Sequence, residues 1–129
     1  MRVASYACHA GSMRCLIVDD SRRFLEAARG LLLREGVTVV GTASSAAEAG
    51  ALIKDLRPDV VLVDIDLGGE SGFELIAQLR SAGSPPPMIL ISTHAEQDYA
   101  DLIAESPAIG FVPKTGLSAA AIQTLLDSV

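Results

Sequence analysis

Five short apolar runs alternate along the chain with stretches whose apolar residues recur at helical spacing. None of the runs has a regular polar face, as is typical of strands that are covered on both sides of a sheet. We therefore predict five strands, at residues 14–18, 37–42, 60–63, 88–91 and 109–112.

The stretches between these runs carry the start and stop signals of helices. Ser45 with Glu48, and Ser71 with Glu74, have the spacing of a capping box, in which each side chain accepts a hydrogen bond from the other residue's backbone amide. Glycine or proline ends three of the helical patterns. We predict helices between residues 21 and 36, 45 and 58, and 71 and 83, at about 96–105, and at 118–126.

A strand followed by a helix, repeated five times, indicates a (βα)5 fold of the α/β class. Strands without a polar face need helices on both sides, so we expect the sheet to be parallel. Right-handed crossovers then give a doubly wound, five-stranded sheet. Such sheets place their sites at the carboxyl ends of strands, at a topological switch point. The 129 residues fit one domain with one core.

The N-terminal residues stand outside this pattern. Residues 1–12 lack the apolar core of a signal peptide, and 11–13 read like a cloning remnant ahead of a native start. We interpret 1–12 as a tag or a disordered segment and 13–129 as the domain. Cys8 and Cys15 give no disulfide framework. No apolar stretch approaches the ~18 residues of a membrane helix, and we expect a cytoplasmic location without membrane contact.

The excess of acidic over basic residues restricts the classes of partner that we expect for this chain. Sixteen acidic and ten basic residues give a net charge of −6. Contacts to nucleic-acid phosphates need clustered lysine and arginine, so we expect no direct binding of nucleic acid by this chain. The same balance suits a cation or a basic partner surface.

Polar side chains stand at the ends of four predicted strands, where a parallel sheet brings them to one edge. Three carboxylates at ~4 Å repel by roughly 4 kcal/mol per pair at an effective dielectric of 20, and a bound cation relieves this repulsion. Oxygen ligands of this kind suit Mg²⁺. A carboxylate there can attack phosphorus, while a lysine and a hydroxyl stabilise the phosphoryl oxygens. The candidates are Asp19, Asp20, Asp64, Ser92, Thr93 and Lys114.

Four segments taken together resemble the receiver domain of two-component response regulators. They are an apolar strand that ends in Asp19-Asp20-Ser21, and the segments 60–64, 89–93 and 110–114. The resemblance covers residues 13–129, nearly the whole chain. It implies a flavodoxin-like sheet with the strand order 2-1-3-4-5. It also implies a signalling switch in a phosphorelay rather than an enzyme.

The resemblance further implies roles for the acidic residues. Asp19, Asp20 and Asp64 would bind Mg²⁺, and the backbone carbonyl of Asp66 would complete the metal site. Asp64 would be the phosphoacceptor, and a sensor histidine kinase or a phosphotransfer protein would modify it. The only reactions implied are self-catalysed phosphotransfer to Asp64 and its dephosphorylation.

The resemblance assigns the remaining polar residues to sensing and output. Ser92 or its neighbour Thr93 would supply the phosphate-sensing hydroxyl, and the position of Ser92 is preferred. Lys114 would contact the phosphoryl oxygens, and Phe111 matches the aromatic switch position. The expected partners of the switched state are a second copy, bound through the face of residues 94–129, or an output domain that this chain does not contain.

Two departures from the family stand out, and two alternatives stay open. Gly68 replaces the usual proline of the loop, and Thr115 follows Lys114 where the family often has proline. The segment 61–66 also resembles the Asp-x-Asp motif of haloacid dehalogenase-type phosphatases, which are Mg²⁺-dependent hydrolases. That family opens its chain with this motif, whereas an acidic pair precedes it here. The second alternative is a pseudo-receiver, an interaction module that is never phosphorylated.

Overall fold

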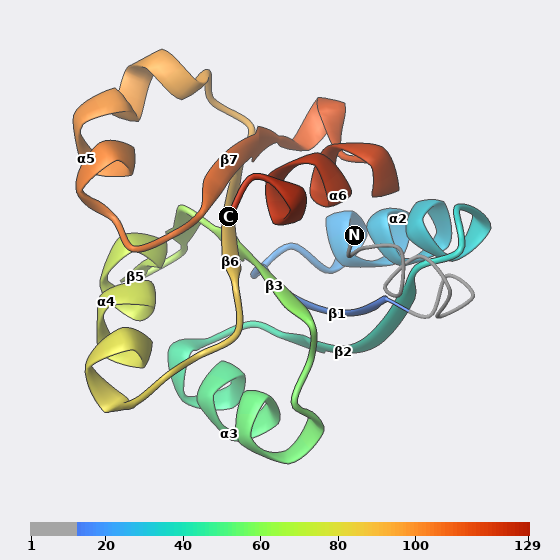
Figure 1. The fold of residues 1–129 in the computed structure, drawn as a ribbon, viewed down its shortest axis with the longest axis horizontal. Helices are drawn as coiled ribbons and strands as arrows, with labels where there is room; N and C mark the ends of the chain where they lie inside the picture. The colour runs from blue at the N-terminus through green and yellow to red at the C-terminus, as the bar shows by residue number, and fades with distance from the viewer. Residues whose placement is uncertain (1–12) are drawn as a thin grey trace.

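A computed structural model describes residues 13–129, so the interpretation of residues 1–12 lies outside the described residues and stays a prediction. The core of the fold is a five-stranded, all-parallel sheet with the order β2-β1-β3-β6-β7 (Figure 1). In chain order this is 2-1-3-4-5, which confirms the flavodoxin-like arrangement. The strands are β1 (Arg14–Val18), β2 (Thr38–Ala43), β3 (Val60–Asp64), β6 (Met88–Ser92) and β7 (Gly110–Pro113).

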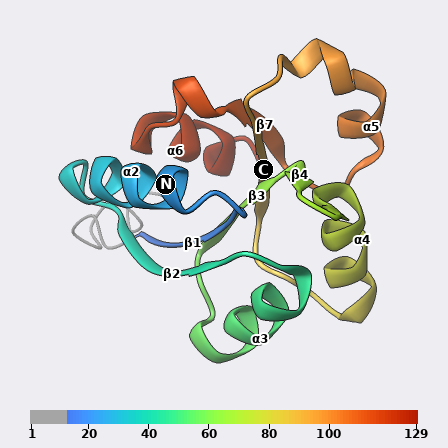
Figure 2. The same cartoon turned by 180° about the vertical axis from the view of Figure 1, so that it is seen from behind.

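Helices cover both faces of this sheet, as the predicted doubly wound fold requires. Helices α2 and α6 lie on one face, and α3, α4 and α5 lie on the other (Figures 1 and 2). The helices are α2 (Arg22–Arg34), α3 (Ala46–Leu56), α4 (Gly72–Ala82), α5 (Ala100–Glu105) and α6 (Ala119–Asp127), with short 3₁₀ turns η1 (Glu96–Tyr99) and η2 (Lys114–Gly116).

Side chains from the two faces of the sheet form two hydrophobic clusters. Ile17 and Leu62 belong to the cluster under α2 and α6, whereas Val18 and Val63 belong to the cluster under α3 and α4. Neighbouring residues of one strand therefore point to opposite faces, and both faces are dry. This is why the strands read as continuous apolar runs rather than as alternating patterns.

Serine side chains cap four of the helices, and two of these caps, Ser45 and Ser71, were predicted from the sequence. In each case the serine Oγ accepts a hydrogen bond from the backbone amide three residues on; the caps are Ser21, Ser45, Ser71 and Ser118. One detail of the predicted capping box is wrong. The Glu48 carboxylate accepts from the amide of Ser44, 2.8 Å away, and not from that of Ser45. The Glu48 side chain thus provides a hydrogen-bond acceptor for the backbone amide of the residue before the cap.

Four strands end one residue later than predicted. In β3 and β6 the apolar pattern stops before a polar side chain, but the ladder of a parallel sheet depends on backbone groups and continues past it. Asp64 pairs with Ile91 in the register of β3 and β6, and Ser92 pairs with Pro113 in that of β6 and β7. Both polar residues are therefore held by the sheet itself.

Three local features differ from the sequence-based prediction. The helix predicted at 96–105 is divided into η1 and α5, and no side chain caps the start of either. The last helix begins after Ser118, which is its cap. The loop at Gly68 is the turn of a small antiparallel ribbon, formed by β4 (Asp66–Leu67) and β5 (Glu70–Ser71). Strands of two residues are too short to show an alternating pattern.

Candidate functional site

Two central strands of the sheet bring the predicted acidic residues together. Asp19 directly follows β1 and Asp64 ends β3, and these neighbouring strands flank the point where the strand order reverses. Lys114 follows β7 and reaches back to both. Its Nζ lies 2.7 Å from Asp19 Oδ2 and 3.2 Å from Asp64 Oδ2. Residues from three distant segments thus meet at the carboxyl edge of the sheet, as predicted.

Asp19 is fully buried, and its two oxygens have different surroundings. Oδ1 accepts a hydrogen bond of 2.8 Å from the amide of Ser21. Oδ2 touches the Lys114 ammonium but accepts no hydrogen bond of regular geometry from the described residues. A buried carboxylate oxygen without a hydrogen bond is costly unless a cation faces it. The Lys114 ammonium supplies part of the positive charge that Oδ2 needs, and this oxygen can still coordinate a further cation.

The donor set of this site fits Mg²⁺. Asp19, Asp20 and Asp64 each offer a carboxylate oxygen, and these oxygens lie within 4.8 Å of one another. The Lys114 ammonium contacts Asp19 and Asp64 only, so one positive charge stands against three carboxylates and the site holds an excess of negative charge. Asp20 is exposed, which leaves room for the water ligands that Mg²⁺ usually keeps. Hard oxygen donors, excess negative charge and an open side are what this cation needs.

Asp66 lies next to the acidic group, in the ribbon that follows β3. Its backbone amide donates a hydrogen bond of 3.3 Å to Asp64 Oδ1. Its own side chain accepts from the amide of Gly68 at 3.1 Å and so stabilises the turn of the ribbon. The side chain is therefore engaged in the local turn, which leaves its predicted metal contact to the backbone carbonyl.

The two candidate hydroxyls differ sharply in environment. Ser92 is buried at the end of β6, and its Oγ accepts a 3.0 Å hydrogen bond from the amide of His94. Thr93 is exposed. Phe111 is half-buried and packs against the cluster on the side of α3 and α4. No hydrogen bond among residues 13–129 joins either hydroxyl to Asp64 or Lys114, so their roles stay predictions.

The charges of the site perturb the acid–base behaviour of two residues. Burial raises the pKa of Asp64 to about 6, and the negative charge of Asp19 adds to this, against the opposing effect of Lys114. Burial acts to lower the pKa of Lys114, but its contacts with Asp19 and Asp64 outweigh burial and hold that pKa above its usual value. Lys114 is thus a permanent cation here.

Comparison with known proteins identifies the family. Residues 15–126 match the family described as the response regulator receiver domain. The chain belongs to this family. Its function is therefore that of a receiver domain in two-component signal transduction, and none of the comparisons supports the phosphatase alternative. Among residues 13–129, no helix is long and apolar enough to cross a membrane.

Individual relatives of this receiver domain include transcriptional regulators. It is 34% identical over 116 residues to the probable transcriptional regulatory protein NarL of Mycobacterium tuberculosis, a match that covers 89% of this chain and 54% of that protein. It is 28% identical to the DNA-binding transcriptional activator EvgA of Escherichia coli, over 79% of this chain and 50% of EvgA. The receiver domain thus spans about half the length of the curated relatives it matches.

Solved structures of receiver domains have the same fold. The signal receiver domain of NarL from Mycobacterium tuberculosis superposes with a TM-score of 0.76 at 34% identity, and the match covers 91% of this chain and 95% of that one. A two-component response regulator of the LuxR family from Aurantimonas gives a TM-score of 0.78 at 29% identity, over 91% and 84% of the two chains.

Two further residues shape the site of this receiver domain, and sequence reasoning gave neither a role there. The Lys114 ammonium lies 4.4 Å from the centre of the Phe24 ring, a cation–π contact that helps to fix the lysine. Gly72 packs so closely on the backbone carbonyl of Asp64 that a Cβ at this position would clash with it. No local sequence signal pointed to a role in the site for either residue.

The raised pKa of Asp64 predicts a pH-dependent difference in stability between wild type and Asp64→Asn in EDTA. The folded domain binds the Asp64 proton more tightly than the unfolded chain, so wild type loses stability as pH rises from about 4 to about 6. Asp64→Asn carries a neutral amide at this position, so its stability should not fall for this reason as pH rises. Above that window the variant should be more stable, by on the order of 2 kcal/mol. Thermal melts across this range measure the difference.

Asp55→Asn, which changes an exposed carboxylate on α3, is the matched control. Its melting temperature should follow that of the wild type at each pH. A difference between wild type and Asp64→Asn that stays constant from pH 4 to pH 7 would contradict the raised pKa.

Proposed function

We propose that Asp64 accepts a phosphoryl group from a sensor histidine kinase or a phosphotransfer protein, in a Mg²⁺-dependent reaction. The observation that carries the proposal is the Lys114 ammonium, which contacts the buried carboxylates of Asp19 and Asp64 together. In this arrangement, the Asp64 carboxylate can meet a phosphodonor next to the fixed ammonium of Lys114. The domain then acts as a signalling switch, and its only chemistry is self-catalysed phosphotransfer and dephosphorylation.

The transfer step follows from the groups around Asp64. A carboxylate oxygen of Asp64 forms a bond to phosphorus, while the bond from phosphorus to the donor's leaving group breaks and that group keeps the electron pair. Lys114 stays charged and stabilises the negative phosphoryl oxygens. Asp19, Asp20, Asp64 and the backbone carbonyl of Asp66 would hold Mg²⁺. When bound, Mg²⁺ neutralises the excess negative charge and lets the anionic donor approach.

We assign phosphate sensing to Ser92 rather than to Thr93. Ser92 ends a central strand and its side chain is buried, so a rotation of its hydroxyl changes packing inside the domain. Thr93 faces solvent, where the same movement would change little. A hydroxyl that turns toward the new phosphate vacates space, which the half-buried ring of Phe111 can enter. Lys114, on the loop after β7, gains the phosphate as a further partner.

The expected output surface is the face of residues 94–129. Helix α5 has six residues and buries none of them fully, so the segment of η1 and α5 should be the easiest part of the domain to shift. Two readouts fit such a shift, namely pairing with a second copy through this face or contact with an output domain. Relatives of the domain are named as transcriptional regulators. We place the protein in the cytoplasm, where kinases draw on ATP.

Amide hydrogen exchange tests this surface. Beryllofluoride mimics the phosphoryl group. Its addition together with Mg²⁺ should change protection within residues 94–117, because Ser92 lies just before this segment and Lys114 lies within it. Spectra with Mg²⁺ alone provide the control for metal binding. Changes confined to α2 and α3, with residues 94–117 unaffected, would contradict the assignment.

The proposed reaction is tested directly with a small phosphodonor. Acetyl phosphate with Mg²⁺ should add one phosphoryl group per chain, as intact mass measures. A wild-type protein that stays unmodified, also with a kinase preparation that labels another receiver, would favour the pseudo-receiver alternative. The complete acidic set and the bridging lysine support the phosphorylated form.

A further inference from the structure

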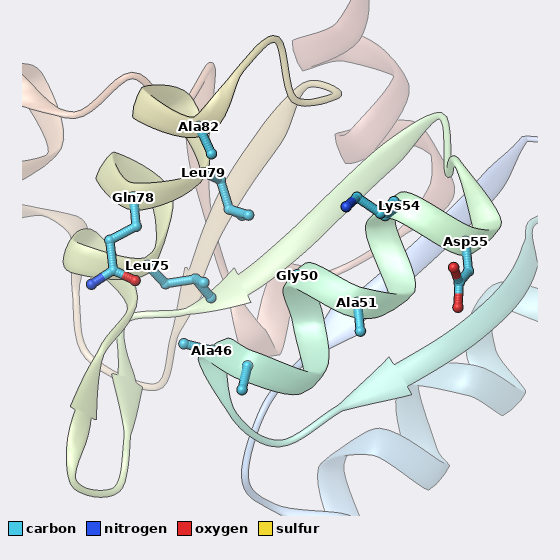
Figure 3. Close-up of a pocket in the computed structure, with 10 residues that line it drawn as sticks. Ala46, Gly50, Ala51, Lys54, Asp55, Leu75, Gln78, Leu79 and Ala82 are labelled. Carbon is cyan, nitrogen blue, oxygen red and sulfur yellow. The ribbon is translucent and has the colours of Figure 1, made fainter.

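A carboxylate of the ribbon joins the acidic site to helix α3. Glu70 lies in β5, and its Oε1 accepts a hydrogen bond of 2.9 Å from the backbone amide of Ala46. Ala46 is the first residue of α3 and stands at the end of the open groove between α3 and α4 (Figure 3). Twenty-four positions of sequence separate the two partners, so this contact fixes the ribbon to a distant element.

The other side of the same ribbon lies against the acidic site. The amide of Asp66 in β4 donates to Asp64, and a Cβ built on Gly68 would lie 3.1 Å from Asp20 Oδ2. Residues 66–69 therefore lie between the acidic residues and the strand that carries Glu70. In the ribbon, Glu70 pairs with Leu67, and the neighbouring residues Ser71 and Asp66 form the other pair. A shift of Glu70 would therefore move Leu67 and, through the adjoining pair, Asp66.

The contact has a clear physical basis. The first backbone amides of a helix lack partners within the helix, and the helix dipole places partial positive charge on them. A carboxylate satisfies one amide and this charge together. Ser45 caps the amide of Glu48, whereas Glu70 caps that of Ala46. The two caps share the end of α3, but Glu70 alone of the two belongs to the ribbon.

We propose that Glu70 is a positioning residue for the metal site. Its hydrogen bond to α3 holds the ribbon in place, so that Asp66 and the turn at Gly68 are ordered before a cation arrives. Without it, part of the binding free energy of Mg²⁺ is spent on ordering the ribbon. The inference rests on the proposed Mg²⁺ site and adds a residue outside its ligand set.

Mg²⁺ titrations of four proteins test the proposal, with binding followed by calorimetry. Glu70→Ala should weaken the affinity for Mg²⁺ roughly threefold, the scale of one interaction with a helix end. Glu70→Gln keeps the acceptor oxygen and should restore most of the loss. Glu48→Ala is the matched control, because it removes a carboxylate from the same end of α3 without touching the ribbon; its affinity should equal that of wild type.

A spectroscopic readout separates positioning from general stability. In the wild type, the amide resonance of Ala46 should shift as Mg²⁺ binds, because the ribbon links it to the site. The shift should vanish in Glu70→Ala and persist in Glu48→Ala. Wild-type affinity in Glu70→Ala, or equal losses in Glu70→Ala and Glu48→Ala, would overturn this inference alone. A wild type that binds no Mg²⁺ would overturn the proposed function as well.

Discussion

Asp64→Asn should abolish phosphorylation of the protein by acetyl phosphate. The neutral amide has no carboxylate oxygen that could form the bond to phosphorus, and no carboxylate other than Asp19 and Asp64 is buried among the described residues. Asp19 is a poor substitute, because it is completely enclosed and one of its oxygens is occupied by the amide of Ser21. Incorporation should fall from one phosphoryl group per chain to none detectable by intact mass.

Asp66→Asn is the matched control for this experiment. It removes a carboxylate two residues from the phosphoacceptor, but the proposal uses only the backbone carbonyl of Asp66, and its side chain faces the turn at Gly68. Labelling should therefore persist in Asp66→Asn. Undiminished labelling of Asp64→Asn would place the phosphoryl group on another residue and refute the assignment.

The strands could be predicted from the apolar pattern of the sequence, whereas their order came from the resemblance to receiver domains. A strand between two layers of helices must be apolar at every position, so runs such as residues 60–63 are visible without any structure. The convergence of Asp19, Asp64 and Lys114 followed from the same reasoning, because parallel strands end at one edge. The structure places these three side chains in direct contact.

Contacts between short or irregular segments could not be predicted in this way. The ribbon of β4 and β5 has two residues in each strand, and a pattern with a period of two is invisible at that length. The hydrogen bond from Ala46 to Glu70 and the ring of Phe24 beneath Lys114 depend on where loops and helix ends lie in space. Local sequence patterns carry no such information.

Removal of divalent cations should stop labelling of the wild type. Carboxylate oxygens of Asp19, Asp20 and Asp64 lie within 4.8 Å of one another, and Lys114 contributes a single positive charge to the group, so an anionic phosphodonor meets net negative charge. Bound Mg²⁺ would neutralise this excess negative charge. EDTA should therefore suppress incorporation from acetyl phosphate, and excess Mg²⁺ should restore it. Labelling that is unchanged in EDTA would contradict the metal site.

Asp20→Ala separates the metal role from a role in folding. Asp20 is exposed and lies among like charges, so its removal should leave the melting temperature in EDTA equal or higher, while the affinity for Mg²⁺ falls roughly tenfold or more. Labelling of this variant should then recover as Mg²⁺ is raised, which a damaged fold would not allow. Asp55→Ala, with an equal loss of charge on the distant helix α3, should bind Mg²⁺ like wild type. Equal affinities in wild type and Asp20→Ala would exclude Asp20 from the site.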